Sequence, residues 1–259
     1  MQVIQLFPDT PLSNYNYIIA NYNSAYVVDP YDAGFVDKEL KSLGLKCLGV
    51  INTHDHWDHT CGNQGMRSIY TDLEIYCHKN SIGVIPEASK GVVTGDRVNL
   101  GPEIEIEFQE TPGHTESHIC LFIKKRGVVE SIVTGDTLFN AGVGNCKNGG
   151  NPNDLFETIR DHFLNLNDSV AVYPGHDYIR NNLRFTLSVE KDNEYAKNLL
   201  EKLENSSSSK CDYITTIGEE KKMNAFFRLN SSSIRQSLNL SSSSDREVFI
   251  KLRSLRDKW

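Results

Sequence analysis

The sequence predicts an α+β fold, in which a strand-rich body is followed by a helical C-terminal part. Short apolar runs bounded by Gly, Pro, Asn or Asp recur through residues 1–180, as expected of strands. Other segments space their apolar side chains by three and four residues, as helices do. After residue 180 the chain changes to charged amphipathic stretches separated by serine runs. A length of 259 residues accommodates one large domain or a domain with an appendage.

Nine segments of the body are candidate strands, and several are rich in β-branched or aromatic residues. They are residues 2–7, 16–21, 25–29, 47–53, 74–78, 104–111, 118–123, 131–136 and 171–175. Helical spacing is found at residues 35–44, 59–70 and 153–166. In the last of these, Asn153 or Asp154 is expected to cap the helix start.

The C-terminal part is predicted to be helical. Residues 182–205 fit one or two helices, and residues 245–259 fit a final amphipathic helix. Serine runs at 206–209, 231–233 and 241–244 are interpreted as flexible connectors. We therefore expect a catalytic domain at residues 1–180 and a helical, substrate-binding domain at residues 181–259.

Charge is unevenly distributed along the chain. The net charge is −7, with −10 in residues 1–180 (13 basic, 23 acidic) and +3 in residues 181–259 (14 basic, 11 acidic). This balance argues against nucleic acid, which usually requires a strongly basic face. It suits a small anionic substrate bound by residues 181–259, although ordinary variation of surface charge explains the counts equally well.

Composition also bears on compartment. No apolar run approaches the eighteen or so residues of a membrane span, so no membrane association is expected. The first twenty residues lack the basic start and apolar centre of a signal peptide, which predicts a cytoplasmic enzyme. The six cysteines are scattered and form no CxxC pair. A disulfide scaffold is therefore not expected, and a zinc ribbon is excluded.

The stretch THDHWDHTCGN at residues 53–63 has the composition of a metal site. His54 ends a predicted buried strand, and His54 and His56 point the same way in extended chain, so both can hold one ion. Asp58 and His59 follow as the chain turns into a helix, and they face a second point nearby. Zinc takes imidazole and carboxylate donors and wants three protein ligands in a catalytic site. Two ions therefore need more donors than this loop contains.

Three later motifs supply further donors, each at a strand end beside glycine. They are His114 in TPGHT, Asp136 in TGDTLF and His176 in YPGHDY. A neighbouring glycine permits the sharp backbone turn that aims a ligand into a crevice. Sites commonly gather beyond the carboxyl ends of strands, which is where these residues are predicted to lie.

The order HxHxDH, GH, GD and PGH resembles the metallo-β-lactamase superfamily over essentially all of residues 1–180. The resemblance implies an αββα sandwich that binds two divalent metal ions, with zinc as the first choice and iron or manganese as alternatives. It assigns ligands to the first ion, to the second ion and to a bridge between them. These are His54, His56 and His114; Asp58, His59 and His176; and Asp136.

Such a site suits thioester hydrolysis. Two ions 3.5–4 Å apart can share a hydroxide and polarise a carbonyl at the same time. Asp58 has a second expected role, which is to orient that hydroxide through its free oxygen. A thiolate leaving group has a low pKa and needs little protonation, so no strong general acid is required.

Within the superfamily, the chain resembles the glyoxalase II (hydroxyacylglutathione hydrolase) family. The similarity lies in LSNYNYIIA, THDHWDHTCGN, GDTLF, PGHDY and the ending LRSLRDKW. It implies hydrolysis of S-D-lactoylglutathione to glutathione and D-lactate, the last step of methylglyoxal detoxification. It also implies that Arg253 and Arg256 bind the glycine carboxylate of glutathione, and Tyr178 is a further expected contact. Arg256 stands where Lys is more usual, and its planar fork is competent for a carboxylate.

Residues 140–153 depart from that family. Asn145 stands where Lys or Arg is expected, and Cys146 and Lys147 replace an aromatic pair. Lys147 could restore the missing charge from two positions further on. The departure leaves the metal chemistry intact, while the thiol carrier and the acyl group stay open.

Other functions of the fold remain as alternatives. A persulfide dioxygenase would use one iron held by two histidines and an aspartate, but such enzymes usually lack the helical tail. A lactonase, a β-lactamase or a hydrolase of another thiol ester is a further possibility, although β-lactamases generally lack an aspartate at the position of Asp136. A structural metal centre is disfavoured because the whole ligand set is retained. The partner is expected to be a small thioester, and the chain a monomer or weak dimer.

Several other residues near these motifs are interpreted as structural. His78 and His118 are expected to be non-ligands, and Cys61 and Cys146 to be small apolar side chains. Asn63 is expected to support the stretch THDHWDHTCGN (residues 53–63, called the ligand loop below) rather than bind metal.

Overall fold

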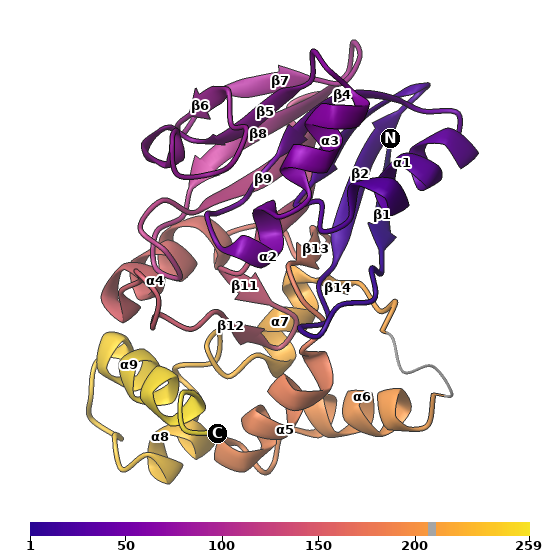
Figure 1. Cartoon of the computed structure of the whole chain (residues 1–259). Helices are drawn as coiled ribbons and strands as arrows, with labels where there is room; N and C mark the ends of the chain where they lie inside the picture. Colours follow the sequence, from indigo (N-terminus) through magenta and orange to yellow (C-terminus); the bar gives the residue numbers. More distant parts are fainter. Residues whose placement is uncertain (207–210) are drawn as a thin grey trace. The chain divides into compact units, whose positions relative to one another are not determined.

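The computed structural model describes residues 1–206 and 211–259, which form two compact units (Figure 1). The first unit comprises Met1–Thr111 and Ser117–Gly135, and the second comprises Pro112–Glu116 and Asp136–Trp259. Both contain strands and helices, which confirms the α+β class. The predicted boundary at residue 180 concerns a different division of the chain, and it stays a prediction.

The first unit contains a six-stranded mixed sheet ordered β1-β2-β3-β4-β5-β6. Its strands are β1 (Gln2–Leu6), β2 (Asn16–Asn21), β3 (Ser24–Val28), β4 (Lys46–Ile51), β5 (Glu74–His78) and β6 (Lys90–Val92). The pairs from β1 to β3 are antiparallel, and those from β3 to β6 are parallel. Because the β3–β4 and β4–β5 pairs are parallel, helices connect these strands, and the carboxyl end of β4 opens into the ligand loop.

Three helices accompany this sheet. They are α1 (Ala33–Ser42), α2 (Trp57–Thr60) and α3 (Asn63–Ile69). Asp32 caps α1 by accepting a hydrogen bond from the amide of Phe35. Apolar residues of α1 and α3, such as Leu40 and Met66, pack with Val27 and Val50 of the sheet in one core cluster. The helix predicted over residues 59–70 is therefore two helices.

The break between α2 and α3 has a packing cause. Gly62 donates its amide to the carbonyl of Pro30 at 3.0 Å. A Cβ atom at Gly62 would lie 2.2 Å from that oxygen, so only glycine fits there. The chain turns at this point, and the ligand loop ends against the segment that leads into α1.

A second layer of the first unit is an antiparallel set of four strands in the order β7, β8, β9 and β10. They are β7 (Arg97–Asn99), β8 (Ile104–Glu110), β9 (Ile119–Lys125) and β10 (Val128–Gly135). Tyr76 of β5 stacks on Phe108 of β8 with ring centroids 6.1 Å apart, which joins the two layers. The short 3₁₀ turn η1 (Lys79–Ser81) follows β5.

The second unit contains two pairs of short strands. These are β11 (Leu138–Phe139) with β12 (Gly142–Val143), and β13 (Ala171–Pro174) with β14 (Thr215–Thr216). Between them lie helix α4 (Pro152–Thr158) and the π-helical segment η2 (Ile159–Phe163). The cap of α4 is Asn151, which accepts from the amide of Asn153. The prediction of Asn153 or Asp154 as the cap is therefore wrong, because Pro152 occupies the first helical position, which proline favours.

The remaining helices of the second unit are α5 (Ile179–Val189), α6 (Glu194–Glu204), α7 (Ile217–Met223), α8 (Ser232–Ser237) and α9 (Asp245–Arg256). Apolar residues of α5 and α6 form a core cluster with Ala141 and Met223. Residues 182–205 thus belong to two helices, and the predicted final helix is confirmed as α9.

Serine has a more ordered role here than the sequence suggested. Ser231 caps α8 by accepting from the amide of Ile234, and Ser244 caps α9 in a capping box with Glu247. The interpretation of the run at 231–233 as a flexible connector is therefore wrong, because it begins α8, whereas the run at 241–244 does connect α8 to α9 and ends in a helix cap. The run at 206–209 lies largely outside the described residues.

All nine predicted strands are confirmed, with ends shifted by at most three residues. The sequence missed β6, β7, β11, β12 and β14, each only two or three residues long. In the described part of the chain, no helix combines the length and the apolar character that a bilayer crossing needs. The six cysteines remain thiols, as expected.

Candidate metal centre

The first unit carries two pairs of donor atoms in the loop after β4. The Nε2 atom of His54 lies 3.1 Å from the Nδ1 atom of His56. The Nε2 atom of His59 lies 3.5 Å from the Oδ2 atom of Asp58. Donors bound to a tetrahedral zinc at 2.0–2.2 Å are about 3.3–3.6 Å from one another. Both spacings are therefore close to those of atoms that share an ion.

Asp29 at the end of β3 orients two of these imidazoles. Its Oδ1 accepts from the amide of Thr53 at 2.8 Å, and its Oδ2 accepts from the Thr53 hydroxyl at 2.6 Å. The same Oδ2 lies 2.9 Å from Nδ1 of His59, and the Thr53 oxygen lies 3.0 Å from Nδ1 of His54. Since both partners accept hydrogen bonds, each imidazole carries its proton on Nδ1 and presents Nε2 as a donor for metal.

Sequence reasoning missed Asp29. Its backbone has a φ of +49°, a left-handed conformation that aspartate tolerates better than most residues. The available signal was an acidic residue at the end of a predicted strand, close to the position that marked His54.

Asn14 holds the carboxylate of the ligand loop. Its Nδ2 donates to Oδ2 of Asp58 at 2.8 Å, and its Oδ1 accepts from the hydroxyl of Thr10 at 2.8 Å. Asn52 donates to the carbonyl of His59 at 2.8 Å, and Asn63 donates to Asn52 at 2.8 Å. Asn63 thus supports the loop through Asn52 and has no ligand role of its own.

The second unit holds three further donors around one carboxylate oxygen. Oδ2 of Asp136 lies 3.5 Å from Nε2 of His114 and 3.3 Å from Nε2 of His176. Nδ1 of His114 donates to the carbonyl of Asn145 at 2.7 Å, which again leaves Nε2 as the donor for metal. The Asp136 oxygen thus lies at donor–donor distance from both imidazole nitrogens.

Glycine is required beside these donors. Gly144, just after β12, packs so tightly that an added Cβ would lie 1.9 Å from the Asp136 carbonyl oxygen and 3.0 Å from Nδ1 of His114. Gly113 before His114 has a φ of +142°. The expectation that glycine permits the turn at a ligand therefore holds for His114, whereas Gly175 before His176 does not have a positive φ.

The donor sets fit divalent metal. Neutral imidazole nitrogens and carboxylate oxygens suit zinc, iron and manganese alike. In the described residues, His78, His118 and His162 belong to none of the candidate donor clusters. His78 instead pairs with Glu110 at 2.8 Å, and His118 contacts the hydroxyl of Thr111 at 3.1 Å. Burial raises the pKa of Cys146 to about 11, so this thiol stays protonated at neutral pH.

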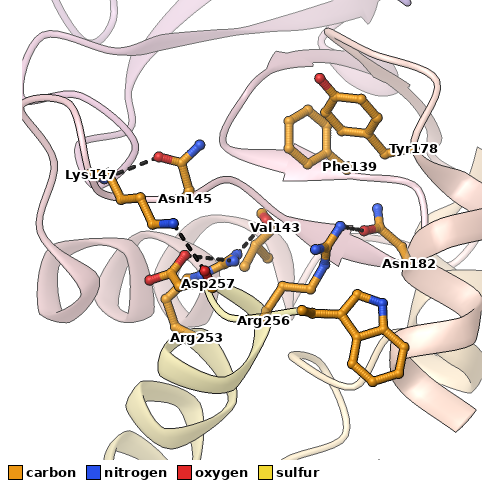
Figure 2. Close-up of a pocket in the computed structure, with 10 residues that line it drawn as sticks. Phe139, Val143, Asn145, Lys147, Tyr178, Asn182, Arg253, Arg256 and Asp257 are labelled. Atoms are coloured by element: carbon orange, nitrogen blue, oxygen red, sulfur yellow. Dashed lines mark hydrogen bonds and ion pairs between the residues drawn. The ribbon is translucent and has the colours of Figure 1, made fainter. Parts of the chain in front are cut away.

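A pocket of about 270 Å³ lies in the second unit (Figure 2). It gathers the five residues predicted to bind substrate together with five that the sequence did not indicate. The predicted residues are Asn145, Lys147, Tyr178, Arg253 and Arg256. The others are Phe139, Val143, Asn182, Asp257 and Trp259.

The cationic side chains of this pocket are held by backbone, amide and carboxylate oxygens, and the carboxylate is Asp257, whose Oδ1 lies 3.1 Å from Nη2 of Arg253. Nη1 of Arg253 donates to the carbonyls of Val143 and Gly144 at 2.8 and 2.9 Å. Nη2 of Arg256 donates to Oδ1 of Asn182 at 3.2 Å, as Figure 2 shows. Burial lowers the pKa of both arginines, although an arginine stays charged at neutral pH. Arg253 is thus part of the pocket wall, and Arg256 is the more adaptable cation.

Lys147 and Tyr178 complete the polar lining. Nζ of Lys147 donates to the carbonyl of Asp257 at 3.0 Å, and its amide donates to Oδ1 of Asn145 at 3.0 Å. The ring of Tyr178 stacks on His176 at 4.9 Å with an interplanar angle of 2°. This stacking places the pocket directly beside a metal-donor histidine.

Comparison with known proteins agrees with this description. The model of the metallo-beta-lactamase superfamily matches residues 9–176, and that of the hydroxyacylglutathione hydrolase C-terminus matches residues 177–259. A hydroxyacylglutathione hydrolase of Polaromonas sp. strain JS666 is 40% identical over 267 residues, covering 100% of both chains. The chain belongs to the hydroxyacylglutathione hydrolase family. The predicted superfamily and family are thereby confirmed.

Further relatives support this membership. The hydroxyacylglutathione hydrolase of Nitrosococcus oceani is 37% identical with 100% of both chains covered. A relative named cytoplasmic hydroxyacylglutathione hydrolase in Arabidopsis thaliana is 32% identical, with 95% of each chain covered. The crystal structure of ETHE1 from Myxococcus xanthus has a TM-score of 0.69 and 26% identity, covering 98% of this chain and 90% of the other. The metallo-β-lactamase fold with a helical C-terminal part is therefore confirmed, and the family implies divalent metal binding.

Proposed function

We propose that this enzyme hydrolyses glutathione thioesters, with S-D-lactoylglutathione as the main substrate and glutathione and D-lactate as products. The observation that carries the proposal is the pairing of donor atoms at 3.1–3.5 Å in each unit. In the second unit, a pocket lined by cationic side chains accompanies these donors. The relatives at 37–40% identity carry the name of this activity.

Two divalent ions, with zinc as the first choice, are proposed as cofactors. Following the family pattern, the first is held by His54, His56 and His114, the second by Asp58, His59 and His176, and Asp136 bridges them. When bound, such ions supply Lewis acidity and lower the pKa of water towards 7. The protein contributes the tautomers that Thr53, Asp29 and Asn145 impose, since these leave Nε2 of His54, His59 and His114, respectively, without a proton.

Asp58 is the proposed catalytic carboxylate. Its Oδ2 is fixed by Asn14 at 2.8 Å, which restricts the orientation of the whole carboxylate. In that orientation the other oxygen can accept a hydrogen bond from the attacking water and direct it at the thioester carbon. Attack forms the new C–O bond and releases one proton of the water to solvent, and the C–S bond then breaks with its electron pair on sulfur. The thiolate leaves without needing a protein acid, because its own pKa is low.

The pocket of the second unit is the proposed site for the thiol carrier. Arg256 and Lys147 offer donors for a carboxylate, Arg253 sets the wall behind them, and Tyr178 and Asn145 line the path towards His176. Glutathione is an anionic thiol and matches the charge of this pocket.

The decisive experiment is an assay of S-D-lactoylglutathione hydrolysis by protein of measured metal content. We expect turnover by the wild type and a large loss in Asp58→Ala. Asp55→Ala is the matched control, because Asp55 is an exposed carboxylate in the same loop and outside the donor pairs. A fully metallated wild type that leaves the thioester intact would overturn the glutathione assignment, and full activity of Asp58→Ala would overturn the role of Asp58.

Metal analysis separates this proposal from the persulfide dioxygenase alternative. The hydrolase needs two ions per chain and no oxygen. One iron per chain, together with oxygen consumption on glutathione persulfide, would establish the alternative.

We also propose a cytoplasmic location, a monomer or weak dimer, and a functional division at residue 180. The location is supported by the name of the Arabidopsis thaliana relative, cytoplasmic hydroxyacylglutathione hydrolase. Fractionation, analytical ultracentrifugation and expression of residues 1–180 alone test these three statements.

A further inference from the structure

Glu220 on α7 is a fully buried carboxyl that lies outside both the donor sets and the pocket lining. Its two oxygens accept from the amide of Ala141 at 3.2 and 2.9 Å, and Oε2 also accepts from Nδ2 of Asn224 at 2.8 Å. The side chain of Thr215 is a further partner. None of these partners is a cation, and burial raises the pKa of Glu220 to about 8. Burying a carboxyl group without a cationic partner costs free energy, so its hydrogen bonds must serve a purpose in the fold.

All of these partners fasten the turn between β11 and β12. Ala141 at the tip of the turn has a φ of +59°, a left-handed conformation that is strained for a residue with a Cβ atom. Asn140 donates to the hydroxyl of Thr215 at 2.7 Å, and Asn224 donates to the carbonyl of Gly142 at 3.2 Å. Three consecutive turn residues are thus tied to Glu220 or to a partner of Glu220.

Hydrogen bonds through Asn182 connect the same turn to the pocket. The carbonyl of Asn140 accepts from Nδ2 of Asn182 at 3.0 Å, while Oδ1 of Asn182 accepts from Arg256 at 3.2 Å. The amide of Asn182 has only one orientation that satisfies both contacts, because its nitrogen must face the carbonyl and its oxygen the guanidinium. Figure 2 shows Asn182 beside Arg256 at the edge of the pocket.

We propose that Glu220 is a positioning residue for the substrate pocket: by fixing the β11–β12 turn it sets, through Asn182, where the guanidinium of Arg256 lies. The inference rests on the proposed function in that the pocket is taken to bind the anionic thiol carrier. Glu220 itself touches no substrate and acts through two intermediates.

The neighbouring Glu219 provides a matched control. It lies on the same helix and accepts from Tyr195 at 2.8 Å, from the hydroxyl of Tyr213, and from the amide of Thr216 at 2.9 Å in a capping box. None of these contacts involves the turn. Glu219→Gln therefore perturbs α7 by the same chemical change without loosening the path to Arg256.

The test compares Glu220→Gln, Glu219→Gln and wild type in thioester hydrolysis, thermal unfolding and metal content. In Glu220→Gln the amide oxygen can take the place of Oε2 and keep Asn224, whereas the NH₂ group replaces the other oxygen and faces the amide of Ala141, so the 3.2 Å hydrogen bond is lost. We expect KM to rise about fivefold, which corresponds to the net worth of one hydrogen bond, with kcat within about twofold of wild type. Glu219→Gln should keep the wild-type KM. A Glu220→Gln protein that is less stable but has the wild-type KM would show a merely structural role and overturn the proposal.

Asn182→Ala breaks the same path nearer the pocket and serves if Glu220→Gln does not fold. It should raise KM to a similar extent, and an unchanged KM would overturn the proposal. Where both variants fold, the double variant should raise KM no further than Asn182→Ala alone. Full additivity of the two effects on KM would contradict a shared path.

Hydrogen exchange separates this proposal from the function on which it rests. If the wild type hydrolyses no glutathione thioester, the proposed function fails. Amide exchange in residues 138–145 then decides the role of Glu220: it should speed up in Glu220→Gln and not in Glu219→Gln. Equal exchange rates in the two variants would overturn the positioning role.

Discussion

The ligand loop of the first unit and the pocket of the second unit are built in different ways. The four donors come from six consecutive positions, so the backbone from the end of β4 through α2 largely sets their spacing. The pocket takes Lys147 from one segment and Arg256 from another more than a hundred residues later. Lys147 and Arg256 are held by contacts with Asp257 and Asn182.

This difference teaches which changes each region tolerates. Metal donors must keep both identity and position, because an ion demands particular atoms at fixed distances. The pocket cations serve substrate binding and packing together, so losing one is expected to change affinity, stability or both. The departure of residues 140–153 from the family pattern falls in the second region and leaves the donor atoms in place.

The largest effect is expected for Asp136→Ala. Its Oδ2 lies within 3.5 Å of the Nε2 atoms of His114 and His176, so its removal takes away the ligand proposed to be shared by the two proposed ions. We expect kcat/KM to fall by more than about a hundredfold, since even the loss of an outer partner of a ligand costs 10–100-fold. Kinetics together with metal content per chain measure this. Wild-type metal content and activity would place Asp136 outside the metal centre.

A smaller effect is expected for Asp29→Asn. The amide can no longer accept from both Thr53 and His59, so the His59 tautomer is released. Metal affinity should fall by about 10–100-fold, measured by competition with a chelator. Asp32→Asn is the control, because Asp32 caps α1 and has no contact with a donor. Equal affinities of the two variants would contradict the role of Asp29.

Replacing Arg253 or Arg256 with alanine should affect substrate binding and stability to different extents. Arg256→Ala is expected to raise KM about tenfold, the worth of one charge-assisted hydrogen bond, with little loss of stability. Arg253→Ala leaves the carbonyls of Val143 and Gly144 without their donor and should lower the free energy of unfolding by about 1–3 kcal/mol, with a rise in KM as well. Denaturant unfolding and kinetics on the same preparations test this. An Arg253→Ala protein of wild-type stability would contradict the wall role.

The smallest effect concerns the pH dependence of stability. Burial raises the pKa of Glu220 from 4.5 to about 8, so the folded chain holds this proton more tightly than the unfolded chain. Its contribution to stability is therefore full below pH 4.5 and is lost as the pH rises towards 8. Glu220→Gln should flatten the decline in unfolding free energy over this range. A slope identical to that of wild type would show that Glu220 does not titrate there.

Sequence alone was enough for the ordered donor motifs, the family and the nine longer strands. These follow from short-range rules: strand alternation, helical spacing, and histidines and aspartates that end strands beside glycine. It did not reveal the role of Asp29, because nothing in a local pattern shows that a carboxylate after β3 reaches His59 thirty positions later.

Only the tertiary structure decided how the pocket is assembled and what its residues do besides binding. The contacts from Arg253 to Val143, from Arg256 to Asn182 and from Glu220 to Ala141 all join segments more than seventy residues apart. Such contacts depend on how the elements pack, and the serine caps of α8 and α9 likewise depend on where the helices begin. The sequence by itself determined the chemistry of the donors. Packing determined which charged side chains are fixed by contacts within the fold and which line the pocket where a substrate is proposed to bind.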